Sequence, residues 1–232
     1  MKQILITGGT GCVGSNLAAV LVRDGCSVRV LRRDQSDLRA LKGIDAEHRI
    51  GDVRDYDSLV RAMEGCDTVF HTAAVVTFAR KRREEQFQVN VLGTRNVVKA
   101  CLATGVNKMV HTSSIAALGH PEGRGIADET KEFNWQRGRG YKLSKLLAEA
   151  EVETGVPLGL QAIIVNPAVI VGERDLQLAA ASHVTRRPRQ RVERDVQRRG
   201  AVLSPEQPAD RSHAAGMVLI LLCSDRRLAI CG

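Results

Sequence analysis

Tyr141 and Lys145 lie four residues apart in the segment YKLSK. On a helix, this spacing places both side chains on one face. A phenol has a pKa of about 10, and a neighbouring ammonium group lowers that pKa because it favours the phenolate. The pair therefore suits acid-base chemistry near neutral pH. The same spacing is also common on amphipathic surface helices, so the interpretation needs support from other residues.

Two serines supply that support. Ser113 and Ser114 follow the apolar run KMVHT at residues 108–112. If this run is a strand of a parallel sheet, both serines lie at the carboxyl edge, where open α/β sheets bind ligands. A serine hydroxyl at that edge can hydrogen-bond a substrate carbonyl or alkoxide oxygen. Together, such a serine, the tyrosine and the lysine predict chemistry at a carbonyl or alcohol carbon.

A glycine-rich segment, ITGGTGCVGSNL, connects an apolar run to a helical pattern. It fits T-G-x-x-G-x-x-G and G-x-G-x-x-G equally well. Glycines in such a turn let the backbone approach a pyrophosphate, and the helix N-terminus attracts the anion. We therefore predict a dinucleotide site rather than a merely flexible turn. Its expected cofactor-binding residues are Gly8, Gly11, Cys12, Val13 and Gly14.

The end of the second predicted strand bears on which dinucleotide is held. An acidic residue at this place binds the ribose 2′-hydroxyl of NAD, whereas an arginine accommodates the 2′-phosphate of NADP. The segment VLRRD puts Arg32 and Arg33 at the strand tip and Asp34 after them. The sequence therefore favours NADP, held by both arginines. The alternative is NAD, with Asp34 on the ribose and the arginines in solvent.

These residues need a scaffold, and the sequence predicts one of alternating strands and helices. The predicted strands are 3–7, 27–31, 48–53, 67–74, 108–114 and 160–172. The predicted helices include 15–25, 56–66, 84–105 and 141–153. Right-handed crossovers turn such an alternation into an α/β fold with a doubly wound parallel sheet of the Rossmann type.

Five motifs, in this order, are similar to those of the extended short-chain dehydrogenase/reductase family. They are the glycine motif, GDVRD at 51–55, HTAA at 71–74, TSS at 112–114 and Y-x-x-x-K. HTSSIAALG and NPAVIVGERD most resemble the nucleotide-sugar epimerase/dehydratase and dihydroflavonol-reductase-like branches. The resemblance covers residues 2 to about 175.

The resemblance implies a role for each matching residue. Ser114 rather than Ser113 polarises the carbonyl because it directly precedes IAALG, Tyr141 is the acid-base group, and Lys145 orients the ribose and lowers the pKa of the tyrosine. Asn90 lies on the helix behind the active site and belongs to the cofactor-binding set. The other implied cofactor contacts are Asp52 and Val53 at the adenine, Ala73 and Ala74 after the fourth strand, and Pro167, Val169 and Ile170 near the nicotinamide amide.

The implied activity is that of an NAD(P)-dependent epimerase, dehydratase or reductase acting on a small molecule, first of all a nucleotide sugar. One alternative is an NADP-dependent ketone reductase resembling dihydroflavonol reductase. Another is a non-catalytic NAD(P)-binding protein that lacks a complete substrate lobe. Relatives also imply a homodimer formed through the helices over 84–105 and 141–153.

The net charge of +8 is concentrated late in the chain. Residues 1–175 hold 24 Lys and Arg against 21 Asp and Glu, whereas residues 176–232 hold 10 arginines, no lysine and 5 acidic residues. Strand and helix periodicity also stops after Gly172. We therefore predict an NAD(P)-binding domain over 1–175 and an atypical arginine-rich segment over 176–232. This segment reads as frame-shifted, rearranged or poorly ordered, with the substrate lobe truncated or atypical.

Composition argues against several other functions. The arginine-rich segment contains no Phe, Tyr or Trp, whereas nucleic-acid surfaces usually combine a basic stripe with stacking aromatics. No apolar run approaches the length of a membrane helix, and the N-terminus lacks the apolar region of a signal peptide. The six cysteines show no zinc spacing. We expect a cytoplasmic protein with free thiols and no metal, membrane or nucleic-acid partner.

Overall fold

Six parallel strands form one sheet in the computed structural model, which describes residues 2–119, 132–135, 140–167, 170 and 173–176. The strand order is β3-β2-β1-β4-β5-β6, and each neighbouring pair is parallel. The strands are β1 (Gln3–Thr7), β2 (Ser27–Arg32), β3 (Glu47–Ile50), β4 (Thr68–His71), β5 (Lys108–Thr112) and β6 (Gln161–Val165). Because the order reverses between β1 and β4, the predicted doubly wound, Rossmann-type sheet is confirmed.

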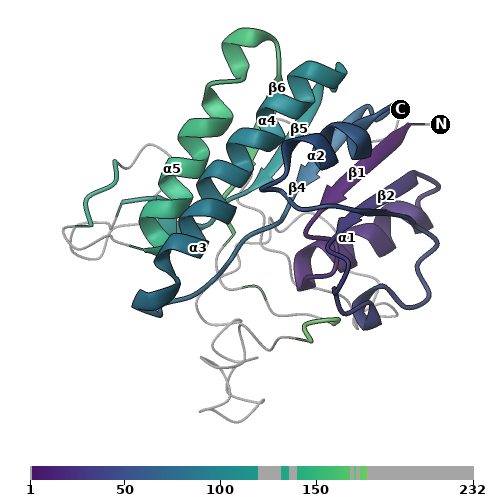
Figure 1. Cartoon of the computed structure of the whole chain (residues 1–232), viewed down its shortest axis with the longest axis horizontal. Helices are drawn as coiled ribbons and strands as arrows, with labels where there is room; N and C mark the ends of the chain where they lie inside the picture. Colours follow the sequence, from purple (N-terminus) through teal and green to yellow (C-terminus); the bar gives the residue numbers. More distant parts are fainter. Residues whose placement is uncertain (1, 120–131, 136–139, 168–169, 171–172, 177–232) are drawn as a thin grey trace, which may run out of the picture.

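Helices flank the sheet (Figure 1). The α-helices are α1 (Cys12–Arg23), α2 (Tyr56–Met63), α3 (Arg83–Phe87), α4 (Gly93–Thr104) and α5 (Tyr141–Glu153). Short 3-10 helices are η1 (Arg39–Leu41), η2 (Arg80–Arg82), η4 (Ile115–Ala117) and η5 (Val156–Leu158), and η3 (Gln88–Leu92) is a π-helical turn. The helices α4 and α5 pack against each other on one side of the sheet (Figure 1).

The core has two parts, one on each face of the sheet. Successive strand residues point to opposite faces, so Leu5 packs with residues of α2, α4 and α5, whereas Ile4 and Ile6 pack with residues of α1. All three side chains are at most 2% exposed. This explains why β1 has no polar face, as a parallel strand covered on both sides requires.

The predicted helix over 84–105 is less regular than its sequence pattern indicates. The elements α3, η3 and α4 follow one another along the chain, so a π-helical turn interrupts the α-helix. Gly105 ends α4 with a φ of 74°, a left-handed conformation that glycine adopts easily. The strands β3, β4 and β5 are each shorter than predicted because their last residues already belong to the loops that form the site.

The predictions on membrane helices and on the arginine-rich segment can be compared with the structure only within its described residues. In the described part of the chain, no helix is both long and apolar enough to cross a membrane. The predicted arginine-rich segment lies outside the described residues, apart from Leu176.

Candidate functional site

A pocket opens at the carboxyl edge of the sheet, where the strand order reverses. Ligands of open α/β sheets bind at such a switch point. The lining comes from the ends of β1, β2, β3 and β4 and from the π-helical turn. It consists of Gly8, Thr10, Gly11, Leu31, Arg32, Arg33, Ser36, Gly51, Asp52, Val53, Thr72, Ala73, Ala74, Val75 and Val89.

The glycine loop at this pocket has no room for larger residues. Gly8 has a φ of +70°, and a Cβ atom there would lie 2.6 Å from the Cα of Ala73. A Cβ on Gly14 would lie 2.5 Å from the carbonyl oxygen of Gly8. Gly11 caps α1 without a side-chain hydrogen bond, so the first N–H groups of the helix are not capped by a side chain. This cradle fits a dinucleotide pyrophosphate, which needs close backbone and a helix N-terminus.

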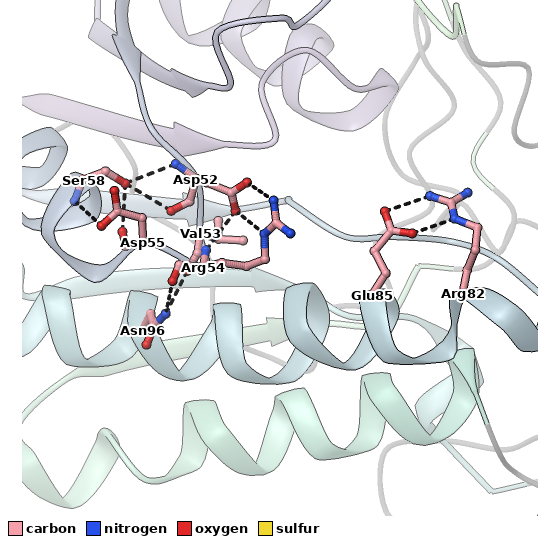
Figure 2. A network of polar contacts seen from close by, with 8 residues as sticks. All are labelled: Asp52, Val53, Arg54, Asp55, Ser58, Arg82, Glu85 and Asn96. Carbon is pink, nitrogen blue, oxygen red and sulfur yellow. Dashed lines mark hydrogen bonds and ion pairs between the residues drawn. The ribbon is translucent and has the colours of Figure 1, made fainter.

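Asp52 and Arg54 form a fixed pair after β3 (Figure 2). Arg54 donates from Nε to Asp52 Oδ1 at 3.0 Å and from its terminal nitrogen to Oδ2 at 2.6 Å. This hydrogen bonding lowers the pKa of Asp52. Asn96 donates to the carbonyl oxygen of Val53 at 3.1 Å, and Ser58 bonds the backbone of Asp52. The loop that lines the expected adenine end is therefore held by α2 and α4.

The two arginines at the tip of β2 both line the pocket, and Asp34 does not. Asp34 lies instead in a neighbouring pocket together with Arg33 and Asp52. Arg32 is held against the backbone, since it donates to the carbonyl oxygens of Arg33 and Asp34 at 3.4 and 3.3 Å. Its Nε atom is buried and has no hydrogen-bond partner among the described residues.

Tyr141, the first residue of α5, lies next to Ser114, which follows β5. Burial raises the pKa of Tyr141, and a side-chain hydrogen bond with Ser114 acts in the opposite direction. Ser114 also accepts a hydrogen bond from the backbone N–H of Ala116 at 3.1 Å and so caps η4. Ser113, by contrast, is only 3% exposed. The structure thus brings Ser114, rather than Ser113, to the tyrosine.

Lys145 lies one turn after Tyr141 on the same helix and is 3% exposed. Its Nζ atom donates a hydrogen bond to the carbonyl oxygen of Thr112, the last residue of β5, at 2.7 Å. Burial lowers the pKa of Lys145 to about 8, and Glu149 opposes this change. We expected Lys145 to lower the pKa of Tyr141. In the structure the group that does so is Ser114, while burial moves the pKa upward.

The model of the NAD dependent epimerase/dehydratase family matches residues 4–203. The chain belongs to this family. Sterol demethylase protein B of Methylococcus capsulatus is 40% identical over 174 residues, which are 75% of this chain and 53% of that protein. A putative dihydroflavonol 4-reductase of Synechocystis is 38% identical over 74% of this chain and 50% of its own length. The chain spans about half the length of the curated relatives it matches.

Solved structures also align with about three quarters of this chain. The crystal structure of gox2253 aligns with a TM-score of 0.69 and 39% identity, covering 75% of this chain and 53% of that one. UDP-glucose 4-epimerase of Thermus thermophilus, solved in complex with NAD, aligns with a TM-score of 0.61 and 28% identity, covering 71% and 54%. The epimerase/dehydratase family and these relatives include oxidoreductases, epimerases and dehydratases, and several of the solved neighbours contain NAD.

The remaining predicted residues do not line the pocket. Asn90 is 2% exposed and does not line it. Its side chain bonds the backbone N–H and carbonyl of Val75 at 2.7 and 3.1 Å and donates to Ser144 at 2.9 Å. It therefore fixes the lining segment from behind. Cys12, Val13, Gly14, Pro167 and Ile170 are described but do not line the pocket, and Val169 lies outside the described residues.

Several lining residues were not predicted from the sequence. Most flank a predicted residue, so only their neighbours signalled them: Thr10, Leu31, Gly51, Thr72 and Val75. Val89, in the π-helical turn, also flanks a predicted residue, Asn90. Ser36 had no such signal, because it reaches the pocket from the loop after β2.

Two buried histidines lie beside the lysine. His71 of β4 and His111 of β5 are neighbours in register, with ring centroids 5.2 Å apart. His71 bonds Thr7 at 2.7 Å and Thr94 at 2.9 Å. Burial lowers the pKa of His71 to about 3, and the charge of Lys145 acts in the same direction. Both histidines are at most 1% exposed and therefore belong to the interior of the sheet.

Proposed function

We propose that this chain transfers a hydride between a nicotinamide dinucleotide and a carbonyl or alcohol carbon. The observation that supports this most directly is the pairing of Tyr141 with Ser114, whose interaction lowers the pKa of the phenol, one helical turn from the buried Lys145. The cofactor would supply or accept the hydride. Tyr141 would give its hydroxyl proton to the substrate oxygen during reduction and take it back during oxidation. Ser114 would hydrogen-bond the same oxygen.

We propose NADP as the preferred cofactor. Among the ion pairs of the described residues, neither Arg32 nor Arg33 takes part, whereas Asp52 is paired with Arg54 and Glu85 with Arg82 (Figure 2). Arginine guanidinium groups bind phosphate well, and Arg32 has a buried Nε atom without a partner in the described part of the chain. The alternative is NAD, the cofactor in several solved neighbours, with Asp34 turned toward the ribose. Fluorescence titration with NADPH and NADH decides between them.

A nucleotide sugar is the first candidate substrate. UDP-glucose 4-epimerase and the enzyme MoeE5, solved with UDP-glucose and NAD, both align with this chain. Four consecutive basic residues at 80–83 form η2 and the first residue of α3. They lie close in sequence to the segment 73–75, which lines the pocket. Such cations suit a diphosphate.

A second candidate, an apolar ring ketone or alcohol, is favoured by the surroundings of Tyr141. The ring of Phe78 meets that of Tyr141 edge to face, with centroids 6.4 Å apart, and Phe78 is 73% exposed. Ile115, directly after Ser114, is 44% exposed. Apolar surface beside an acid-base residue suits an apolar ligand. The relatives named for sterol and dihydroflavonol chemistry are consistent with this candidate.

One experiment tests these proposals together. Binding of NADPH and NADH is measured first, and turnover is then followed at 340 nm with UDP-sugars, dihydroflavonols and 3-hydroxysteroids. Because an epimerase shows no net change of cofactor, the UDP-sugars are also analysed for epimers and dehydrated products. Binding without turnover of any substrate would favour the alternative of a non-catalytic NAD(P)-binding protein. Pairing of two chains through α4 and α5 and a cytoplasmic location stay predictions, which sedimentation and cell fractionation can check.

A further inference from the structure

Glu149 lies on the same face of α5 as Tyr141 and Lys145, because the three residues follow one another at intervals of four. Its half-buried side chain contacts Asn166, the residue that follows β6. Glu149 Oε1 accepts a hydrogen bond from Asn166 Nδ2 at 2.6 Å. Neither the family motif nor the proposed chemistry assigns a role to this carboxylate.

Asn166 links Glu149 to the serine. It follows β6 and is only 6% exposed. Its Nδ2 atom donates a second hydrogen bond to the backbone carbonyl oxygen of Ser114 at 3.1 Å. One buried amide group therefore joins the carboxylate of the helix to the backbone of the residue that touches Tyr141. Short contacts of this kind fix a backbone position because breaking them leaves buried polar groups unpaired.

The backbone around Ser114 has two further supports. Ser113 N–H donates to the carbonyl oxygen of Val165 at 2.8 Å, and Ile115 N–H donates to that of Pro167 at 3.1 Å. These bonds attach the loop to the segment that contains Asn166 but not to α5. The Glu149–Asn166 bond joins this segment to the helix that carries Tyr141. The Glu149–Asn166 bond therefore helps to set the distance between Ser114 and Tyr141.

The charge of Glu149 is balanced locally. Burial raises the pKa of its carboxyl, while the hydrogen bond from Asn166 and the charge of Lys145 act in the opposite direction, and Glu153 adds to the increase. Lys145, itself bonded to Thr112, anchors α5 to the end of β5 one turn away. The helix is thus attached to the sheet edge at two points, one direct and one through Asn166.

We propose that Glu149 is a positioning residue that holds Ser114 against Tyr141 through Asn166. The proposal rests on the proposed function only in that Ser114 and Tyr141 act on the substrate oxygen. Glu149 itself does not contact substrate or cofactor. Loss of the link is expected to separate the serine hydroxyl from the tyrosine, even in the absence of any substrate.

The experiment measures the pKa of the Tyr141 phenol. The chain contains two tyrosines, Tyr56 and Tyr141, so a Tyr56→Phe background leaves one. Incorporation of 3-fluorotyrosine then gives a single ¹⁹F signal, whose chemical shift reports the ionisation of the Tyr141 phenol. The ring fluorine also makes this phenol more acidic. Because Ser114 lowers the pKa of Tyr141, Ser114→Ala is the reference and is expected to raise it by about half a pH unit or more.

Three variants then show whether Glu149 acts on Tyr141 through its bond with Asn166. Glu149→Ala removes the acceptor and is expected to raise the pKa of Tyr141 in the same direction as Ser114→Ala. Glu149→Gln keeps an amide oxygen that can accept from Asn166, so we expect it to restore most of the wild-type pKa. Glu151→Ala is the matched control on α5, because Glu151 pairs with Arg95 away from the site, and it is expected to change nothing.

Asn166→Ala breaks the same link from the other side and guards against a Glu149 variant that fails to fold, which circular dichroism would reveal. The double variant of Glu149→Ala and Asn166→Ala is expected to shift the pKa no further than either alone, as for residues acting in one chain. An unchanged pKa in Glu149→Ala or Asn166→Ala, with Ser114→Ala shifted, would overturn the proposal. No shift in Ser114→Ala would also overturn it. Neither result depends on turnover, so a failure of the proposed function is seen separately.

Discussion

The Nζ atom of Lys145 donates to the carbonyl oxygen of Thr112 at 2.7 Å. The lysine is therefore a buried cation that is attached to the end of β5 and held beside two neutral histidines. An amine in such surroundings loses solvation, which is why its pKa falls to about 8. Its charge then changes within a pH range that both stability and activity can report.

Lys145→Met is expected to alter the pH dependence of stability. The pKa of Lys145 is about 8 in the folded protein and 10.5 as a reference. Below pH 8 both states are protonated and the folded state bears the full cost of the buried charge. Between these pKa values only the unfolded state binds the proton, so this group's contribution to stability rises with pH.

We therefore expect Lys145→Met to gain up to about 3 kcal/mol over the wild type at pH 7, less the cost of the lost hydrogen bond. This advantage is expected to shrink between about pH 8 and 10. Urea unfolding at pH 7 and pH 9.5 measures it. Lys99→Met, an exposed position on α4, is the control, and an equal difference at both pH values would contradict the assignment.

Tyr141→Phe is expected to lower kcat by about 10² or more, because general acid-base groups contribute about 10² to 10⁴ in rate. The phenylalanine keeps the ring that contacts Phe78, so cofactor affinity should change little. Steady-state kinetics on the substrate found by the panel measures the rate, and fluorescence titration measures the affinity. Tyr56→Phe, on α2, is the control. A variant with wild-type kcat would remove Tyr141 from the proton transfer.

Gly8→Ala is expected to weaken dinucleotide binding at least tenfold, equivalent to about 1.4 kcal/mol. Its Cβ would lie 2.6 Å from the Cα of Ala73, at a φ of +70°. Gly43→Ala is a matched control, because its φ is +79° and nothing lies within 4 Å of its Cβ in the described part of the chain. Both variants should lose about 1 kcal/mol of stability from the left-handed backbone. Equal affinities for the cofactor would show that the cradle does not hold the pyrophosphate.

Arg33→Ala is expected to lower NADP affinity by about tenfold and to leave NAD affinity nearly unchanged, since only NADP carries the 2′-phosphate. Titration of the protein with each reduced cofactor measures both affinities. Arg39→Ala, which removes an exposed arginine paired with Asp37, serves for comparison. If both cofactors lost affinity equally, Arg33 would act on a part that they share.

The sequence predicted the fold and the helix and strand ends on which the candidate site residues lie, because these depend on short-range patterns. Apolar runs of about five residues and helical periodicity locate the described strands other than β3, whose sequence is EHRI, and the helices that carry Tyr141 and Asn90. The fixed spacing of Tyr141 and Lys145 becomes a shared helix face without further information. The preference for Ser114 over Ser113 came from the family motif and stays a prediction; in the structure Ser113 is buried, and Ser114 is the serine that affects the pKa of Tyr141.

Other features depend on contacts between distant segments, which a single sequence does not encode in a recognisable pattern. Ser36 and Val89 reach the pocket only because a loop and a π-helical turn bring them there. The bond between Glu149 and Asn166 joins α5 to the residue after β6. The direction of the pKa change of Tyr141 was also beyond the sequence, since it depends on how deeply the ring is buried.

Every described residue that lines the dinucleotide pocket lies between Gly8 and Val89, whereas Ser114, Tyr141, Lys145 and Asn166 all come later in the chain. Both groups lie at the carboxyl edge of the sheet. Under the proposed function, the pocket residues proposed for cofactor choice and the residues proposed for proton transfer therefore lie in separate, consecutive stretches of the chain. A chimera that joins the first stretch to the second stretch of another family member should inherit its cofactor preference from one parent and its reaction from the other.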